Sequence, residues 1–226
     1  MARTITLPAA DGHALEAFRA DPAGPAKGGV VILHAIYGLT RHIADVCDQF
    51  AEDGYAAIAP ALYDRTGRGR VFGYDAAGQE AGMAQRAHLA EATVALDVAA
   101  ARDALRPTGK VAVLGFCTGG SWAWAMAAAI DLDAAVIMYG SDVYDLRDRT
   151  PRCPTVLHYG DRDHVVAMPQ VDAIRVAHPA LPCHIYPGAG HAFYNPDQAH
   201  YDPAAARLAR MRNNDFLATH LAPSPH

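Results

Sequence analysis

The sequence predicts an α/β fold in which a doubly wound, mostly parallel sheet carries helices on both faces and follows an N-terminal antiparallel hairpin. Three observations predict it: six continuous apolar runs, segments of helical pattern between them, and an Asp11-Gly12 turn dipeptide between two short segments near the start. Strands that are apolar on both sides are typical of parallel sheets covered on both faces. Their alternation with helices favours right-handed crossovers.

The elements can be assigned in chain order. A turn that ends in glycine predicts the hairpin, with strands over 4–7 and 14–19. The buried strands are expected over 30–34, 56–61, 111–116, 134–139, 155–159 and 182–186. The helices are expected over 41–53, 79–105, 121–130, 169–177 and 203–220. The 65–78 stretch is the longest irregular connection, and we expect either a lid or binding loop or a plain surface loop there.

Length and composition indicate one domain over 1–226. The chain has 226 residues, of which 51% are hydrophobic and 19% charged, and its formal net charge is −5. A chain of this length can bury a core of its own. Dense basic sequence is limited to the short 65–70 segment, so no nucleic-acid partner is expected. The sequence is compatible with a monomer or a dimer.

The compartment is expected to be the cytoplasm. No apolar run approaches the roughly 20 residues that cross a bilayer, and the first residues lack the apolar core of a secretory signal. We therefore expect no membrane partner. The four cysteines are scattered and form no C-x-x-C pair, so they are interpreted as reduced thiols.

One cysteine lies in a special setting. The segment Gly115-Phe-Cys117-Thr-Gly119 runs from a buried strand directly into a helix, which is the layout of a nucleophile elbow with cysteine in place of serine. Flanking glycines allow the tight, strained turn that lifts the nucleophile above the sheet. The amino end of the following helix favours a thiolate and a developing oxyanion. The alternative is that Cys117 is a small buried hydrophobic residue.

Two later segments favour the catalytic interpretation. Asp161 and Asp163 come just after the 155–159 strand, and His191 lies in a glycine-rich loop after the next strand. Ligand sites of doubly wound sheets gather at the carboxyl ends of strands. Nucleophile, acid and histidine in this order are typical of the triad of α/β-hydrolases.

The residues now support a family resemblance. From about Val30 to the C-terminal helix, the chain resembles the dienelactone hydrolase (carboxymethylenebutenolidase) family, which has the α/β-hydrolase fold and a Cys-His-Asp triad. The segments that carry the resemblance are 31–38, 54–63, 115–120, 139–140, 160–163 and 188–193. The resemblance implies a hydrolase of small esters or lactones that needs no cofactor and no metal.

By position, the resemblance implies that Cys117 is the nucleophile, His191 the general base and Asp163 the acid that orients the base. Asp161 is the competing acid. We favour Asp163 because the family pattern leaves two residues between the glycine and the acid.

The family's oxyanion hole corresponds to the backbone N–H groups of Ile36 and Thr118. Five further positions are candidate pocket residues, and they are His34, Ala35, Tyr37, Arg86 and Phe193.

The chain also departs from the family pattern. The family's studied enzyme has an acidic residue just before the Ile of the oxyanion strand, where it holds the thiol, and this chain has Ala35. A serine after the triad histidine and an arginine beyond the Phe help to hold the dienelactone carboxylate; this chain has Ala192 and then Tyr194-Asn195. Dienelactone itself is therefore doubtful as the substrate.

Two other functions stay open at this point. One is a noncatalytic relative of the same fold that acts as a binding partner. The other is metal-assisted hydrolysis at a zinc site. Its candidate ligands are His158, Asp161, Asp163, His164 and His191.

Overall fold

The computed structural model describes residues 1–222, so the last four residues of the expected unit lie outside the described part. It confirms the expected fold class: an eight-stranded sheet has the order β1-β2-β4-β3-β5-β6-β7-β8. The strands are β1 (Arg3–Pro8), β2 (Ala14–Ala20), β3 (Gly29–Leu33), β4 (Ala56–Pro60), β5 (Val111–Phe116), β6 (Ala134–Met138), β7 (Thr155–Gly160) and β8 (Cys183–Tyr186). The α-helices are α1 (Arg41–Glu52), α2 (Ala76–Arg86), α3 (Glu91–Leu105), α4 (Thr118–Ala129), α5 (Met168–Ala177) and α6 (Pro203–Leu221).

The sheet begins with the expected hairpin. β1 pairs antiparallel with β2, and β2 pairs antiparallel with β4, whereas all later neighbours are parallel. The turn between β1 and β2 has Gly12 at φ 85°, a left-handed conformation that glycine adopts without a steric penalty.

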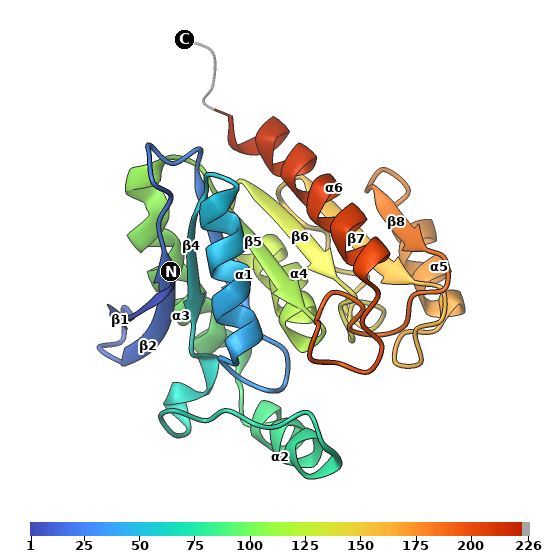
Figure 1. Cartoon of the computed structure of the whole chain (residues 1–226), viewed down its shortest axis with the longest axis horizontal. Coiled ribbons are helices and arrows are strands. Elements are labelled where there is room, and N and C mark those ends of the chain that lie inside the picture. The colour runs from blue at the N-terminus through green and yellow to red at the C-terminus, as the bar shows by residue number, and fades with distance from the viewer. Residues whose placement is uncertain (223–226) are drawn as a thin grey trace.

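The five strands β3 to β7 are buried along their whole length, because helices cover both faces of the sheet. In Figure 1, α1 and α6 lie on the face toward the viewer, and α3 and α4 lie on the other face. The buried stripe of α3 includes Val94, Val98, Ala101 and Leu105, at the spacing of one helix face. Burying each larger aliphatic side chain contributes about 1.5–3 kcal/mol.

The expected helix over 79–105 is wrong as a single element, because the chain forms α2 and α3 there with a turn between them. The turn carries the sequence Ala87-His-Leu-Ala90 and has neither Gly nor Pro, so no local signal marks it. Its cause is tertiary. Gly82 of α2 packs against the carbonyl of Ile36, near the carboxyl end of β3, while α3 packs on the sheet face. The two helices therefore have different partners, and Ala90 is extended between them.

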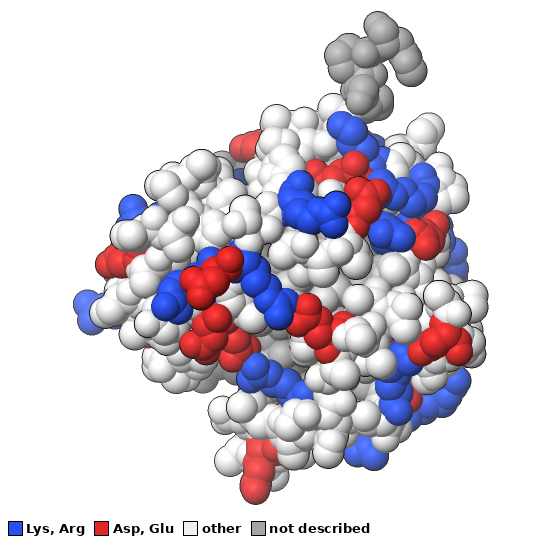
Figure 2. All heavy atoms as spheres, turned by 180° about the vertical axis from the view of Figure 1, so that it is seen from behind, with Lys and Arg blue, Asp and Glu red and all other residues white. Residues whose placement is uncertain are grey.

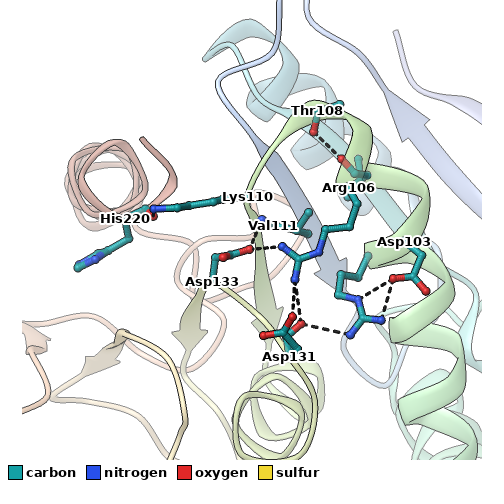
Figure 3. Close-up of polar contacts among 10 residues, drawn as sticks. Asp103, Arg106, Thr108, Lys110, Val111, Asp131, Asp133 and His220 are labelled. Carbon is teal, nitrogen blue, oxygen red and sulfur yellow. Dashed lines mark hydrogen bonds and ion pairs between the residues drawn. The ribbon is translucent and has the colours of Figure 1, made fainter. Parts of the chain in front are cut away.

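A polar cluster joins segments at the amino ends of the central strands (Figure 3). The Asp133 carboxylate accepts a hydrogen bond from the backbone N–H of Val111 at 2.7 Å and another from Arg106 at 2.5 Å. Lys110 donates to the carbonyl of His220 near the end of α6 at 3.3 Å. These contacts fix the start of β5 to the start of β6 and to α6, at the edge of the sheet opposite the elbow.

Charges of both signs intermingle on the surface. On the face seen in Figure 2, Lys and Arg side chains lie among Asp and Glu side chains rather than in one broad basic area. Within residues 1–222, no helix has the length and apolar character needed to span a membrane.

Candidate active site

Cys117 lies at a strained turn between β5 and α4. Its backbone has φ 53° and ψ −118°, which few residues other than glycine adopt. The Cys117 N–H donates to the carbonyl of Met138 at 3.0 Å, which fixes the turn against the neighbouring strand β6. A Cβ atom on Gly115 would overlap the carbonyl of Gly119, and one on Gly119 would overlap the carbonyl of Leu33. The glycines on both sides of Cys117 are therefore required by close backbone packing.

His191 and Asp163 form a buried pair. The Nδ1 atom of His191 lies 2.8 Å from Oδ2 of Asp163, whose side chain has no exposed surface. The other carboxylate oxygen accepts the backbone N–H groups of Val165 at 2.7 Å and Val166 at 2.9 Å. These bonds hold the carboxylate in one orientation, so the His191 ring presents its Nε2 atom away from it.

The competing acid has a different partner. Asp161 accepts the backbone N–H of Gly188 at 2.6 Å and so fixes the loop that leads to His191. Of the two acids that follow β7, Asp163 is therefore the one in contact with the imidazole.

The Cys117 thiol and the His191 ring influence each other electrostatically. Burial raises the pKa of Cys117, but the neighbouring His191, chiefly through its charge, and the Thr118 backbone N–H outweigh burial and lower it overall. Burial lowers the pKa of His191, but the charge of the Cys117 thiolate and the Asp163 carboxylate raise it overall. Burial likewise raises the pKa of Asp163, and His191 with the two backbone N–H groups lowers it overall. Each of these shifts favours the charged form of its group.

The two expected oxyanion donors lie in the same region. Thr118 is the first residue of α4, where backbone N–H groups have no acceptor within the helix. Ile36 follows β3, and its carbonyl accepts a hydrogen bond from the Tyr63 hydroxyl at 3.0 Å. Both residues line the cavity that contains Cys117. Within the described residues, the buried Thr118 hydroxyl makes no hydrogen bond of ordinary geometry.

A cavity of about 540 Å³ opens over Cys117 and His191. Its volume suits a small molecule. Residues from α2 and the preceding loop form part of the wall, and the members of this group are Tyr74, Gln79, Met83 and Arg86. The expected long loop is thus partly a cavity wall, with its irregular part shortened to 66–75 by the start of α2.

The candidate pocket residues divide into two groups. Ala35, Tyr37 and Arg86 line the cavity. His34 and Phe193 do not, which corrects that expectation. The His34 ring packs on Tyr63 with centroids 4.8 Å apart, and burial lowers its pKa to about 4, so it is a neutral core side chain.

Phe193 is completely buried beneath the cavity wall residue Tyr139. Its ring packs on Tyr139 at 5.4 Å between centroids, and the Tyr139 ring packs edge-on against His191 at 5.1 Å. Phe193 therefore supports the His191 ring through Tyr139 and does not line the cavity.

Sequence reasoning missed much of the cavity wall, including Ser141 and Asp142. The Asp142 carboxylate accepts hydrogen bonds from Arg86 and from the Ser141 hydroxyl, the latter at 2.8 Å. A signal was available, because both residues follow β6 at the carboxyl edge of the sheet, where ligand sites gather.

Comparison with known proteins identifies the family of the chain. The family model described as the dienelactone hydrolase family matches residues 15–221. The chain belongs to the dienelactone hydrolase family. Carboxymethylenebutenolidases from Pseudomonas putida and Pseudomonas knackmussii are each 33% identical to it over 224 residues, with 95% of both chains covered.

Solved structures resemble the whole described fold. A Klebsiella pneumoniae protein assigned as a dienelactone hydrolase matches with a TM-score of 0.85 and 26% identity, covering 96% of this chain and 98% of that one. A dienelactone hydrolase-like promiscuous phosphotriesterase from metagenomic libraries matches with a TM-score of 0.79 and 21% identity, covering 97% and 98%. At that lower identity the likeness concerns the fold alone.

Proposed function

We propose that this chain hydrolyses a small ester or lactone by a Cys-His-Asp triad, through a cysteinyl acyl-enzyme. The observation that carries the proposal is the arrangement in one cavity of an elbow thiol, an imidazole and a buried carboxylate bonded to that imidazole at 2.8 Å. The family membership and the carboxymethylenebutenolidase relatives support ester or lactone hydrolysis as the reaction class.

Acylation begins with the Cys117 thiol and the His191 imidazole. His191 holds the thiol proton at Nε2, and the thiolate sulfur forms a bond to the substrate carbonyl carbon. The carbonyl π electrons move to oxygen, and the backbone N–H groups of Ile36 and Thr118 stabilise that oxyanion. When the carbonyl re-forms, the bond to the alcohol oxygen breaks, and the leaving oxygen takes the proton from His191. Asp163 stays ionised and keeps Nδ1 protonated.

Deacylation repeats the sequence with water. His191 takes a proton from the water molecule as its oxygen bonds to the thioester carbon, and the same two N–H groups stabilise the second oxyanion. Cleavage of the carbon–sulfur bond releases the carboxylic acid and returns the proton to the thiol and imidazole pair. For a lactone, the alcohol and the acid stay in one product molecule.

The other cysteines have environments that disfavour nucleophilic attack. Burial raises the pKa of Cys47 to about 12 and the pKa values of Cys153 and Cys183 to about 11. Their thiolates are therefore scarce at neutral pH, whereas the pKa of Cys117 is lowered.

The test is acyl trapping with a slow activated ester followed by peptide mass analysis. The acyl mass is expected on the peptide that contains Cys117, and Cys117→Ala is expected to abolish both the label and ester turnover. Cys183→Ala is the matched control, and it should keep both. A stable label on Cys47, Cys153 or Cys183 with Cys117 untouched would contradict the proposal.

The alternative functions have weaker support. Among residues 1–222, no three His, Cys, Asp or Glu side chains come together as a metal site. His158, one of the candidate zinc ligands, is fully buried with Nδ1 2.7 Å from the Tyr186 hydroxyl. A noncatalytic role would instead appear as the absence of any Cys117-dependent turnover across a panel of esters and lactones.

A further inference from the structure

The cavity wall contains an internal ion pair. A guanidinium nitrogen of Arg86, on α2, bonds to Oδ2 of Asp142, which follows β6. Arg86 and Asp142 side chains are 28% and 29% exposed, so both charges remain accessible from the cavity that they line.

The Asp142 side of the pair is firmly held next to the elbow. The backbone N–H of Asp142 donates to the Ser121 hydroxyl at 2.8 Å, and the Ser141 hydroxyl donates to the Asp142 carboxylate. Ser121 and Ser141 also donate their backbone N–H groups to the carbonyl of Cys117, at 3.1 Å and 3.3 Å. The carboxylate is therefore attached to the same turn that carries the nucleophile.

Among the described residues, the cavity wall contains one guanidinium and one carboxylate. Apart from histidines, the residues that line the cavity include Arg86 as their cation and Asp142 as their anion. Burial raises the pKa of Asp142, but Arg86, Ser141 and Ser121 together lower it overall, so the carboxylate stays ionised at neutral pH. The positive charge of Arg86 is thus already paired with the negative charge of Asp142.

We propose that the Arg86–Asp142 pair makes this site selective for uncharged esters and lactones and against those that carry a carboxylate. This inference rests on the proposed function and specifies its substrate class. A substrate carboxylate would meet a guanidinium that is already paired, with Asp142 repelling it at close range. An uncharged amide or hydroxyl can accept from the other N–H groups of Arg86 and donate to Asp142 without displacing either.

The experiment uses two matched chromogenic probes. Both are 4-nitrophenyl esters of adipic acid, and the far end of the acyl chain is a primary amide in one and a carboxylate in the other. The two ends have nearly the same shape and differ by one charge. Wild type is expected to give a kcat/KM at least about tenfold higher for the amide probe than for the carboxylate probe.

Two variants shift this preference in opposite directions. Asp142→Asn keeps the side-chain shape and leaves the Arg86 charge unmatched, so the amide preference should fall by about tenfold or reverse. Arg86→Gln leaves the Asp142 charge unmatched, so the preference should increase. Asp148→Asn is the matched control, because it removes one negative charge from an exposed side chain outside the cavity. Its preference should equal that of wild type.

Three results would contradict the proposed selectivity or the proposed function. Equal kcat/KM for the two probes in wild type, or a preference for the carboxylate, overturns the inference even if a variant fails to fold. A folded Asp142→Asn protein that behaves like Asp148→Asn also overturns it. Turnover that survives Cys117→Ala contradicts the proposed function instead, whereas Cys117-dependent turnover that favours the carboxylate contradicts the charge selection alone.

Discussion

Asp161 and Asp163 both follow β7, but they have different hydrogen-bond partners. Asp163 contacts His191, and Asp161 contacts the backbone of Gly188. Replacing the orienting acid by its amide favours the wrong imidazole tautomer, which lowers kcat by up to about 10⁴-fold in a serine protease. We expect Asp163→Asn to lower kcat by several hundredfold or more. Asp161→Asn should have a small effect, because an amide oxygen can still accept from Gly188.

The measurement is kcat on one activated ester for both variants, with thermal unfolding to check that each is folded. Equal losses in the two variants, or a larger loss in Asp161→Asn, would reject the assignment of Asp163.

We expect Ala35 to affect the protonation of the Cys117 thiol, because its side chain carries no carboxylate. It lines the cavity beside Ile36, and its methyl side chain has no acceptor that could hold the Cys117 proton. The pKa of Cys117 is lowered because the charge of His191 and the hydrogen bonds outweigh burial. A lowered thiol pKa increases the fraction of thiolate at any given pH, and acidification through that pKa removes the thiolate. We therefore expect wild type to alkylate readily at Cys117 without substrate.

Ala35→Glu should shift this behaviour. A carboxylate near the thiol raises the thiol pKa, so the pH profile of the iodoacetamide rate should move to higher pH and the rate at pH 7 should fall. Ala35→Gln is the matched control, since it adds the same bulk without the charge. If folded Ala35→Glu alkylates at Cys117 as fast as Ala35→Gln across the range, the absent carboxylate has no bearing on the thiol.

The site residues that the sequence predicted are those marked by neighbouring glycines. The residues that it missed enter the site through contacts with distant segments of the chain. Cys117 is marked by its two glycines and His191 by its glycine-rich loop. The Arg86–Asp142 contact joins residues 56 positions apart and has no local signature. Phe193 was expected in the pocket, but its side chain, two residues after His191, is buried in the core.

Among the elements, those with a strong apolar pattern were predicted within a few residues. The strands of the parallel sheet agree because continuous burial requires continuous apolar sequence, as in β5. The break between α2 and α3 was missed because Ala, His and Leu are all compatible with a helix. The two helices pack on different partners, α2 on the Ile36 carbonyl through Gly82 and α3 on the sheet, and contacts between distant segments are not visible in a helical pattern.

The loop over 66–75 and α2 become part of the cavity wall because hydrogen bonds attach the loop to the segment before α1. Tyr74 donates to the Thr40 hydroxyl at 3.1 Å, and the backbone N–H of Phe72 donates to the Tyr37 carbonyl at 3.0 Å. These bonds attach the loop to the start of α1, so that Tyr74 stands in the cavity wall. Whether this wall moves as a lid stays a prediction.

For the whole molecule, Arg65 connects three parts of the chain. It donates to Asp97 of α3 at 2.9 Å and 2.7 Å and to Asp11 of the β1–β2 turn at 2.7 Å. The Asp97 side chain is 1% exposed, so its charge is tolerated because Arg65 matches it. The hairpin, the segment after β4 and α3 are thereby fixed to one another. That 1–226 forms one domain, and that it resides in the cytoplasm, stay predictions.

Arg65→Met should therefore destabilise the fold by about 3 kcal/mol, since it leaves the Asp97 carboxylate buried without a partner. Asp11→Asn is the control and should have little effect, because the Asp11 end of the network is exposed. Arg65→Met combined with Asp97→Leu should recover most of the loss, because it removes both charges.

The loss should also depend on pH. Burial raises the pKa of Asp97 overall, although the hydrogen bond and charge of Arg65 oppose that rise. Without Arg65 this opposing effect is lost and the pKa rises further, so folded Asp97 of the variant binds its proton still more tightly relative to unfolded Asp97. Stability from such a group is present below its unfolded pKa and is lost as pH rises through the folded pKa. Urea unfolding of Arg65→Met should thus show a smaller deficit against wild type at pH 5 than at pH 7.5. A deficit that is equal at both pH values, or absent, would mean that Asp97 does not depend on Arg65 for its charge.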